Sequence, residues 1–192
     1  YVDVLKLPQK IFHGSELLLT EDLLRLEAEL DQKQPGALIV ELPSNPLLDC
    51  VDIQTVAKLA HERNILVIAD DTIGSAVNID PLPYADIVFS SLTKSFAGRG
   101  DILAGGLVIS PESSWSKELN EIILGCSLAE LSDPDAIALE QTSRDVNERL
   151  QRLNTACLKL KLKLEKHPEV SRVFHPFECQ NFKTLLRPNG GY

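Results

Sequence analysis

The first half of the chain alternates between short apolar runs and longer stretches in which apolar residues recur every three or four positions. Continuous apolar runs are typical of strands covered on both faces, and the longer spacing is typical of amphipathic helices. The expected strands are the alternating segment 1–7 and the runs 37–42, 65–69, 85–89 and 106–109; the expected helices are 20–30, 52–63 and 113–124. This order predicts an α/β domain with a mainly parallel sheet.

The chain after Pro111 has the pattern of helices. A long helix is expected over 132–167, from the start signal Ser132-Asp133-Pro134 to the residue before Pro168. Its apolar residues step by three, four or seven positions, at Leu139, Val146, Leu150, Leu153, Cys157, Leu160 and Leu164. This seam is shorter than four heptads, so packing against the α/β body is favoured over a free coiled coil. We expect three parts: an α/β body over 1–131, a connecting helix over 132–167, and the beginning of a smaller domain over 168–192, its first strand at 170–174.

Composition excludes several classes of protein. The chain has 28 acidic and 19 basic residues, a formal charge of -9, which disfavours binding to nucleic acid. No apolar run approaches the roughly 20 residues of a membrane-spanning helix, and the first residues lack the pattern of a secretory signal, so we expect a cytoplasmic protein. The sequence contains no methionine and begins at Tyr1, so we expect it to be a central part of a longer product. Its four cysteines form no C-x-x-C pair and no metal site is expected.

Polar residues follow three of the expected strands directly. Asn45 comes after the first apolar run, Asp70 after the second, and Ser91, Thr93 and Lys94 after the third. Ligands of parallel α/β sheets bind beyond the carboxyl ends of the strands, so these side chains should meet in one crevice. A lysine for a Schiff base, a carboxylate for a pyridinium nitrogen and hydroxyls for a phosphate are what pyridoxal 5′-phosphate requires. The set therefore predicts a site for that cofactor.

Each of these residues also has an ordinary structural role. A lysine after a strand is usually a solvated surface charge, an aspartate there is usually a turn former, and Ser-Asn-Pro is common turn chemistry. The hydroxyls of Ser91 and Thr93 can simply bond to nearby backbone. The order of all five on consecutive strands favours the cofactor site over these separate roles.

Three segments carry a resemblance to a known family. Ala69-Asp70-Asp71-Thr72 resembles the motif V-D-N-T, and Glu41–Pro46 resembles E-T-P-T-N-P. Ser90–Lys94 with Gly98 and Asp101–Gly105 resembles H-S-A-T-K…G…D-V-L-A-G. These are motifs of the pyridoxal-phosphate enzymes of cysteine and methionine metabolism, and the chain most resembles the fungal type of cystathionine γ-synthase.

The resemblance implies fold type I, with a large cofactor domain built on a seven-stranded sheet, a long helix and a small α+β domain. It implies that Lys94 is the Schiff-base lysine, Asp70 the partner of the pyridinium nitrogen, and Ser91 and Thr93 phosphate ligands. Asn45 would lie near cofactor and substrate, and Tyr1 would stack on the cofactor ring. It also implies a homodimer or homotetramer that acts on small amino-acid substrates.

The activity implied is transsulfuration, as in methionine biosynthesis: cysteine replaces the γ-substituent of an O-acylated homoserine. Cystathionine β- or γ-lyase is the alternative, since the same residues serve both, and a truncated, non-catalytic paralogue is the alternative from another class. The family's phosphate loop and substrate-binding arginine lie outside this sequence, so the 192 residues alone are expected to be inactive. Asp71 stands where the family has asparagine, and Ser90 where it has histidine.

Overall fold

The computed structural model describes residues 22–126 and 130–191, and also residues 6, 9, 10, 14, 16 and 18. Tyr1 and the strand expected over 1–7, apart from Lys6, lie outside the described residues. The fold and the candidate site are therefore built from Asp22 onward.

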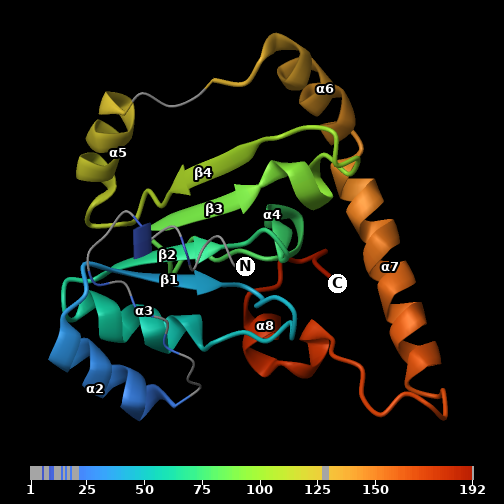
Figure 1. Ribbon diagram of the computed structural model, residues 1–192, viewed down its shortest axis with the longest axis horizontal. Coiled ribbons are helices and arrows are strands. Elements are labelled where there is room, and N and C mark those ends of the chain that lie inside the picture. Colours follow the sequence, from blue (N-terminus) through green and yellow to red (C-terminus); the bar gives the residue numbers. More distant parts are fainter. Residues whose placement is uncertain are drawn as a thin grey trace.

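In the described part of the chain, a four-stranded sheet forms the centre of the molecule (Figure 1). Its strands are β1 (Ala37–Glu41), β2 (Leu66–Asp70), β3 (Ile87–Ser91) and β4 (Gly105–Ile109). They lie in the order β1-β2-β3-β4; the first three are parallel and β4 is antiparallel to β3. The mainly parallel α/β sheet predicted from the sequence is confirmed.

Strand β3 begins two residues later than its apolar run predicts. The N–H groups of Tyr84 and Ala85 donate to the carbonyl oxygen of Pro81, at 3.0 and 2.9 Å, and so form a turn. Backbone groups used in this turn cannot extend the strand. The bounds of the other three strands lie within one residue of the prediction.

Helices α2 (Leu23–Lys33) and α3 (Ile53–His61) form a layer beside the sheet, with α3 against β2 and α2 packed on α3 (Figure 1). Each begins after an aspartate whose carboxylate caps it. Asp22 accepts from the N–H of Leu24 at 2.9 Å, and Asp52 from the N–H of Thr55 at 3.2 Å. The buried layer between α3 and the sheet includes Ile53, Ala57, Ala60, Val67 and Ala69.

Shorter elements complete the chain. They are α4 (Ser75–Asn78), a π-helical turn η1 (Leu92–Phe96), α5 (Ser116–Gly125), a 3-10 turn η2 (Pro176–Glu178) and α8 (Gln180–Thr184). None of the helices in the described part of the chain is long and apolar enough to cross a membrane.

The region expected to be one helix over 132–167 contains two. Helix α6 (Asp133–Ser143) is capped by Ser132, and α7 (Val146–Leu164) follows after Arg144 and Asp145. The apolar seam is also less buried than expected. Leu150 is the one buried residue of α7, whereas Leu153 and Leu160 are 51% and 55% exposed. Helix α7 runs along one side of the molecule (Figure 1), and three residues of its seam, Leu153, Leu160 and Leu164, are exposed.

The C-terminal segment returns to the sheet domain. Residues 170–174, expected to be a strand, form no regular element. In α8, Phe182 is completely buried in the core of the α/β body, with Leu185 beside it. Leu186 forms an isolated antiparallel bridge with Ile79, and Asn181 donates to the carbonyl oxygen of Cys50 at 3.0 Å. Residues 176–187 thus share one core with the sheet, and the three-part division of the chain remains a prediction.

Candidate active site

The carboxyl ends of β1, β2 and β3 lie side by side. Glu41 is in register with Asp70, and Asp70 with Phe89. Two further backbone bonds continue the ladder beyond the strands: Leu42 N–H donates to Asp70 O at 2.9 Å, and Asp71 N–H donates to Phe89 O at 3.1 Å. The residues that follow the three strands therefore leave the sheet at the same edge, as the sequence predicted.

Asp70 ends β2, and its position is fixed by its own turn. The residue is 8% exposed, and its Oδ1 accepts a hydrogen bond from the N–H of Thr72 at 2.9 Å. The hydroxyl of Thr72 in turn accepts from the N–H of Ser91, at the end of β3, at 2.9 Å. This chain of bonds ties the end of β2 to the end of β3, three residues before Lys94. Thr72 was part of a recognised motif, but the sequence did not indicate that it bridges the two strands.

Lys94 lies in η1, the π-helical turn directly after β3, and is exposed. Its backbone leaves the helical conformation, at φ −81° and ψ −121°. Gly98 closes the turn with an N–H bond of 2.8 Å to Lys94 O and has a φ of +73°, a conformation that favours glycine. Short π-helical segments of this kind occur often at functional sites. Lys94 is thus held on a tight turn at the edge of the sheet, as an exposed residue.

The two residues whose hydroxyls are expected to bind phosphate, Ser91 and Thr93, lie at the end of β3 and in η1. Thr93 Oγ1 donates to Ala104 O at 3.3 Å and accepts from Ala104 N–H at 3.0 Å. The proton of Thr93 therefore takes part in the local backbone bonding that the sequence offered as its alternative role. To bind a phosphate oxygen, Thr93 must redirect this proton from a long hydrogen bond. Ser91, next to it at the end of β3, is half-buried.

Asn45 lies in the exposed loop after β1, where its N–H donates to Glu41 Oε2 at 3.1 Å. This bond orients the start of the loop beside the end of β1. Tyr1, the residue expected to stack on the ring, is outside the described residues. Backbone and side-chain hydrogen bonds thus bring Asp70, Ser91, Thr93 and Lys94 to one edge of the sheet, with Asn45 on the neighbouring loop.

Asp71, beside Asp70, is the more deeply buried carboxyl group at 2% exposure. Burial raises its pKa to about 6, although a hydrogen bond from Ser90 acts in the opposite direction. Its Oδ1 is buried and has no hydrogen-bond partner among the described residues. Two adjacent carboxyl groups therefore occupy different environments at the edge of the sheet.

The chain matches the model of one protein family, the Cys/Met metabolism PLP-dependent enzymes, over residues 13–190. The chain belongs to this family. Pyridoxal phosphate is thus the cofactor of its family, and the resemblance drawn from the three motifs is confirmed.

A curated relative and two solved structures show how far the similarity extends. Cystathionine gamma-synthase of Neurospora crassa is 34% identical over 100% of this chain and 32% of its own length. The structure of cystathionine gamma synthase from Xanthomonas oryzae pv. oryzae, in complex with aminoacrylate and cysteine, has a TM-score of 0.80 at 23% identity, over 98% of this chain and 50% of that one. Cystathionine gamma-lyase from Lactobacillus plantarum, complexed with L-serine, has a TM-score of 0.79 at 24% identity, over 97% and 50%. The structures show a shared fold, and the chain spans about a third of the length of the curated relative.

Proposed function

We propose that this protein is a pyridoxal-phosphate enzyme of transsulfuration, a cystathionine γ-synthase in which cysteine replaces the γ-substituent of an O-acylated homoserine. The observation that carries the proposal is the bonded connection between the ends of β2 and β3, which sets the Asp70 carboxylate beside the turn that bears Lys94. The 34% sequence identity to the Neurospora crassa synthase, which extends over 100% of this chain, supports the choice of reaction.

The side chains at this edge fit the chemical groups of the cofactor. A nearly buried carboxylate fits a cationic ring nitrogen, an exposed primary amine fits an aldehyde, and neighbouring hydroxyls fit a phosphate. When bound, pyridoxal phosphate supplies an electron sink for the substrate carbon next to the amino group. The residues present thus include a partner for each polar end of the molecule.

In this proposal each residue has one task. Asp70 holds a proton on the ring nitrogen, and its bond from Thr72 keeps the carboxylate at a fixed position. Lys94 Nζ would bind the cofactor, and once the amino group of a substrate displaced it, the freed amine would move protons between substrate carbons. Ser91 and Thr93 bind the phosphate, and Asn45 lies near the substrate.

Borohydride reduction followed by peptide mapping tests the cofactor site. The full-length natural protein, loaded with pyridoxal phosphate, is expected to yield a reduced pyridoxyl adduct on Lys94, and Lys94→Ala is expected to lose it with little change in stability. An adduct on Lys58 or Lys117 instead would contradict the assignment. Asp70→Asn keeps an acceptor for the Thr72 N–H, so the fold and the adduct should remain while kcat falls about 10²–10³-fold.

Cystathionine β- or γ-lyase is the second candidate, because a synthase and a lyase have nearly equal TM-scores, 0.80 and 0.79. An assay of the full-length protein with cysteine plus O-acylated homoserine, against cystathionine alone, separates the two activities. Product from both or from the first mixture supports the synthase. Product from cystathionine alone overturns it in favour of the lyase, and no product from either points to a non-catalytic paralogue.

We further propose that the protein acts on small amino-acid substrates as a homodimer or homotetramer in the cytoplasm. The Xanthomonas oryzae and Lactobacillus plantarum structures of the same fold hold small amino-acid ligands, which supports the substrate class. Light scattering of the full-length protein tests the assembly, and a monomer at all concentrations would contradict it.

A further inference from the structure

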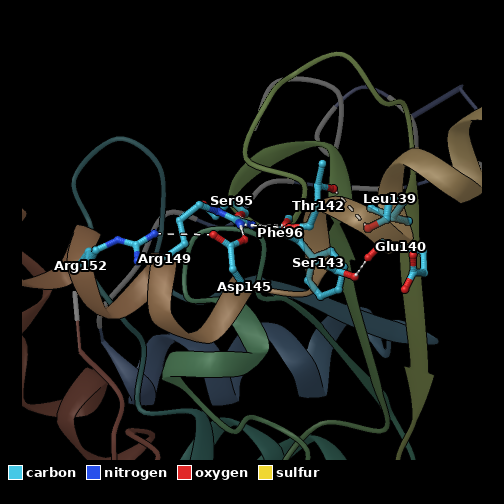
Figure 2. A network of polar contacts seen from close by, with 9 residues as sticks. All are labelled: Ser95, Phe96, Leu139, Glu140, Thr142, Ser143, Asp145, Arg149 and Arg152. Atoms are coloured by element: carbon cyan, nitrogen blue, oxygen red, sulfur yellow. Dashed lines mark hydrogen bonds and ion pairs between the residues drawn. The ribbon is translucent and has the colours of Figure 1, made fainter.

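The side chain of Arg149, in the first turn of α7, contacts the turn that carries Lys94 (Figure 2). Its Nη2 donates to Phe96 O at 2.5 Å and lies 3.4 Å from Ser95 O. These carbonyl groups belong to the two residues directly after Lys94 in η1. The Arg149 side chain is only 19% exposed, so these charge-assisted bonds are largely sheltered from water.

The same guanidinium group also joins α6 to α7. Its Nη1 donates to Thr142 O at 3.0 Å and contacts the carboxylate of Asp145 (Figure 2). Carbonyl groups in the last turn of a helix have no partner within that helix, and Arg149 supplies one at the end of α6. The break between the helices is therefore bridged by the group that holds the lysine turn.

Gly98 provides the space for this arrangement. A Cβ atom at position 98 would lie 2.7 Å from Arg149 Nε, closer than such atoms approach one another. The Nε atom is buried and has no partner among the described residues. The guanidinium group thus sits directly on the backbone of the lysine turn.

We propose that Arg149 is a positioning residue for Lys94, holding the η1 turn through the Ser95 and Phe96 carbonyls so that the amine points into the cofactor site. The inference rests on the proposed function, in which Lys94 binds the cofactor. A planar fork with five N–H donors can bond several carbonyl groups at once, whereas an ammonium group provides a single point charge. Arg149→Met should therefore lose the ordering of the η1 turn, and Arg149→Lys should keep only part of it.

The matched control is Arg152, three residues further along α7. Its guanidinium lies 3.6 Å from the same Asp145 carboxylate and has no hydrogen bond to η1 among the described contacts, and its side chain is 69% exposed. Arg152→Met removes a similar cation from the same helix and leaves the lysine turn untouched. An effect confined to position 149 then comes from its bonds to η1 or to Thr142, and a change at amides 92–98 identifies the bonds to η1.

The first measurement is hydrogen exchange of the full-length protein without cofactor. Arg149→Met is expected to raise the exchange rates of amides 92–98 at least about tenfold, while Arg152→Met leaves them unchanged. Equal rates in wild type and Arg149→Met would overturn the proposal. If Arg149→Met does not fold, Arg149→Lys decides: faster exchange confined to 92–98 supports the proposal, and wild-type rates there refute it.

The second measurement uses the loaded protein. For Arg149→Met, kcat should fall up to about 100-fold with KM changed less than about threefold, because the substrate contacts remain while the amine is displaced. The pH at which the absorbance of the bound cofactor changes should shift in Arg149→Met and remain as in wild type in Arg152→Met; no shift would count against positioning. Absence of an adduct on Lys94 in the wild type would refute the proposed function instead. The exchange experiment would then still test whether Arg149 holds the η1 turn.

Discussion

At the scale of single residues, Asp70 and Asp71 show how two neighbouring carboxyl groups acquire different roles. Asp70 accepts a hydrogen bond from Thr72, next to the candidate cofactor site. Asp71 is buried with an unpartnered Oδ1, and burial raises its pKa from 3.8 to about 6. Where the family motif has a neutral asparagine, this chain therefore has a carboxyl group that is partly ionised near neutral pH.

The burial of Asp71 should make the free energy of unfolding depend on pH. Because the pKa of Asp71 is higher in the folded than in the unfolded protein, protonation stabilises the fold fully below about pH 4, and that stabilisation is lost as the pH rises to about 6. The shift corresponds to about 3 kcal/mol. Asp71→Asn should abolish this loss. The free energy of unfolding of the variant minus that of wild type should therefore increase between pH 4 and 6 and stay constant above pH 6.

Urea denaturation at a series of pH values measures the two free energies. Asp86→Asn is unsuitable as a control because that carboxylate accepts bonds from Val67 N–H, His61 and Ser113. Glu112→Gln, at an exposed position, is suitable and should leave the pH dependence of wild type unchanged. A constant difference between wild type and Asp71→Asn from pH 4 to 7 would contradict the raised pKa.

At the scale of elements, α8 anchors the C-terminal segment to the sheet domain, and its most deeply buried side chain is Phe182. Phe182 is completely buried and packs near Phe177, with ring centroids 6.1 Å apart. Phe182→Ala should lower the free energy of unfolding by about 3–5 kcal/mol, because it removes a ring and leaves a cavity. Phe174→Ala, at a ring that is 42% exposed, is the control and should cost far less. Similar losses for both variants in urea denaturation would show that α8 is not an anchor.

The strands were predictable because each is a continuous apolar run, and their order placed Asp70 and Lys94 at one edge of the sheet. Local pattern could not show that Tyr84 and Ala85 form a turn, since both suit a strand. It also could not show the break after α6. The Thr142 carbonyl oxygen at that break accepts from the Arg149 side chain, a contact that local pattern does not reveal. The sequence likewise gave no sign that Arg149 meets the Lys94 turn, since that contact joins residues more than fifty positions apart.

At the scale of the whole molecule, the apolar seam of α7 is the largest difference between the pattern of the sequence and its packing. The seam predicted a buried helix face, yet Leu153, Leu160 and Leu164 are each more than a third exposed. These three leucines share one face of the helix, whereas Leu158 and Leu162, which are also more than a third exposed, lie on the opposite face. An apolar face of this kind on a surface helix favours association with other apolar surfaces.

The 192-residue chain expressed by itself should therefore associate with itself in a concentration-dependent way. Leu153 and Leu160 are one heptad apart, so replacing both by glutamate puts two charges on the same exposed face and should reduce the association. Gln151→Glu with Thr155→Glu adds the same charge at exposed polar positions of α7 and should have little effect. Light scattering after size exclusion measures the mass of each variant. If both pairs of substitutions lower the mass equally, net charge and not the apolar face drives the association, and a wild-type chain that stays monomeric would show that this face needs no partner.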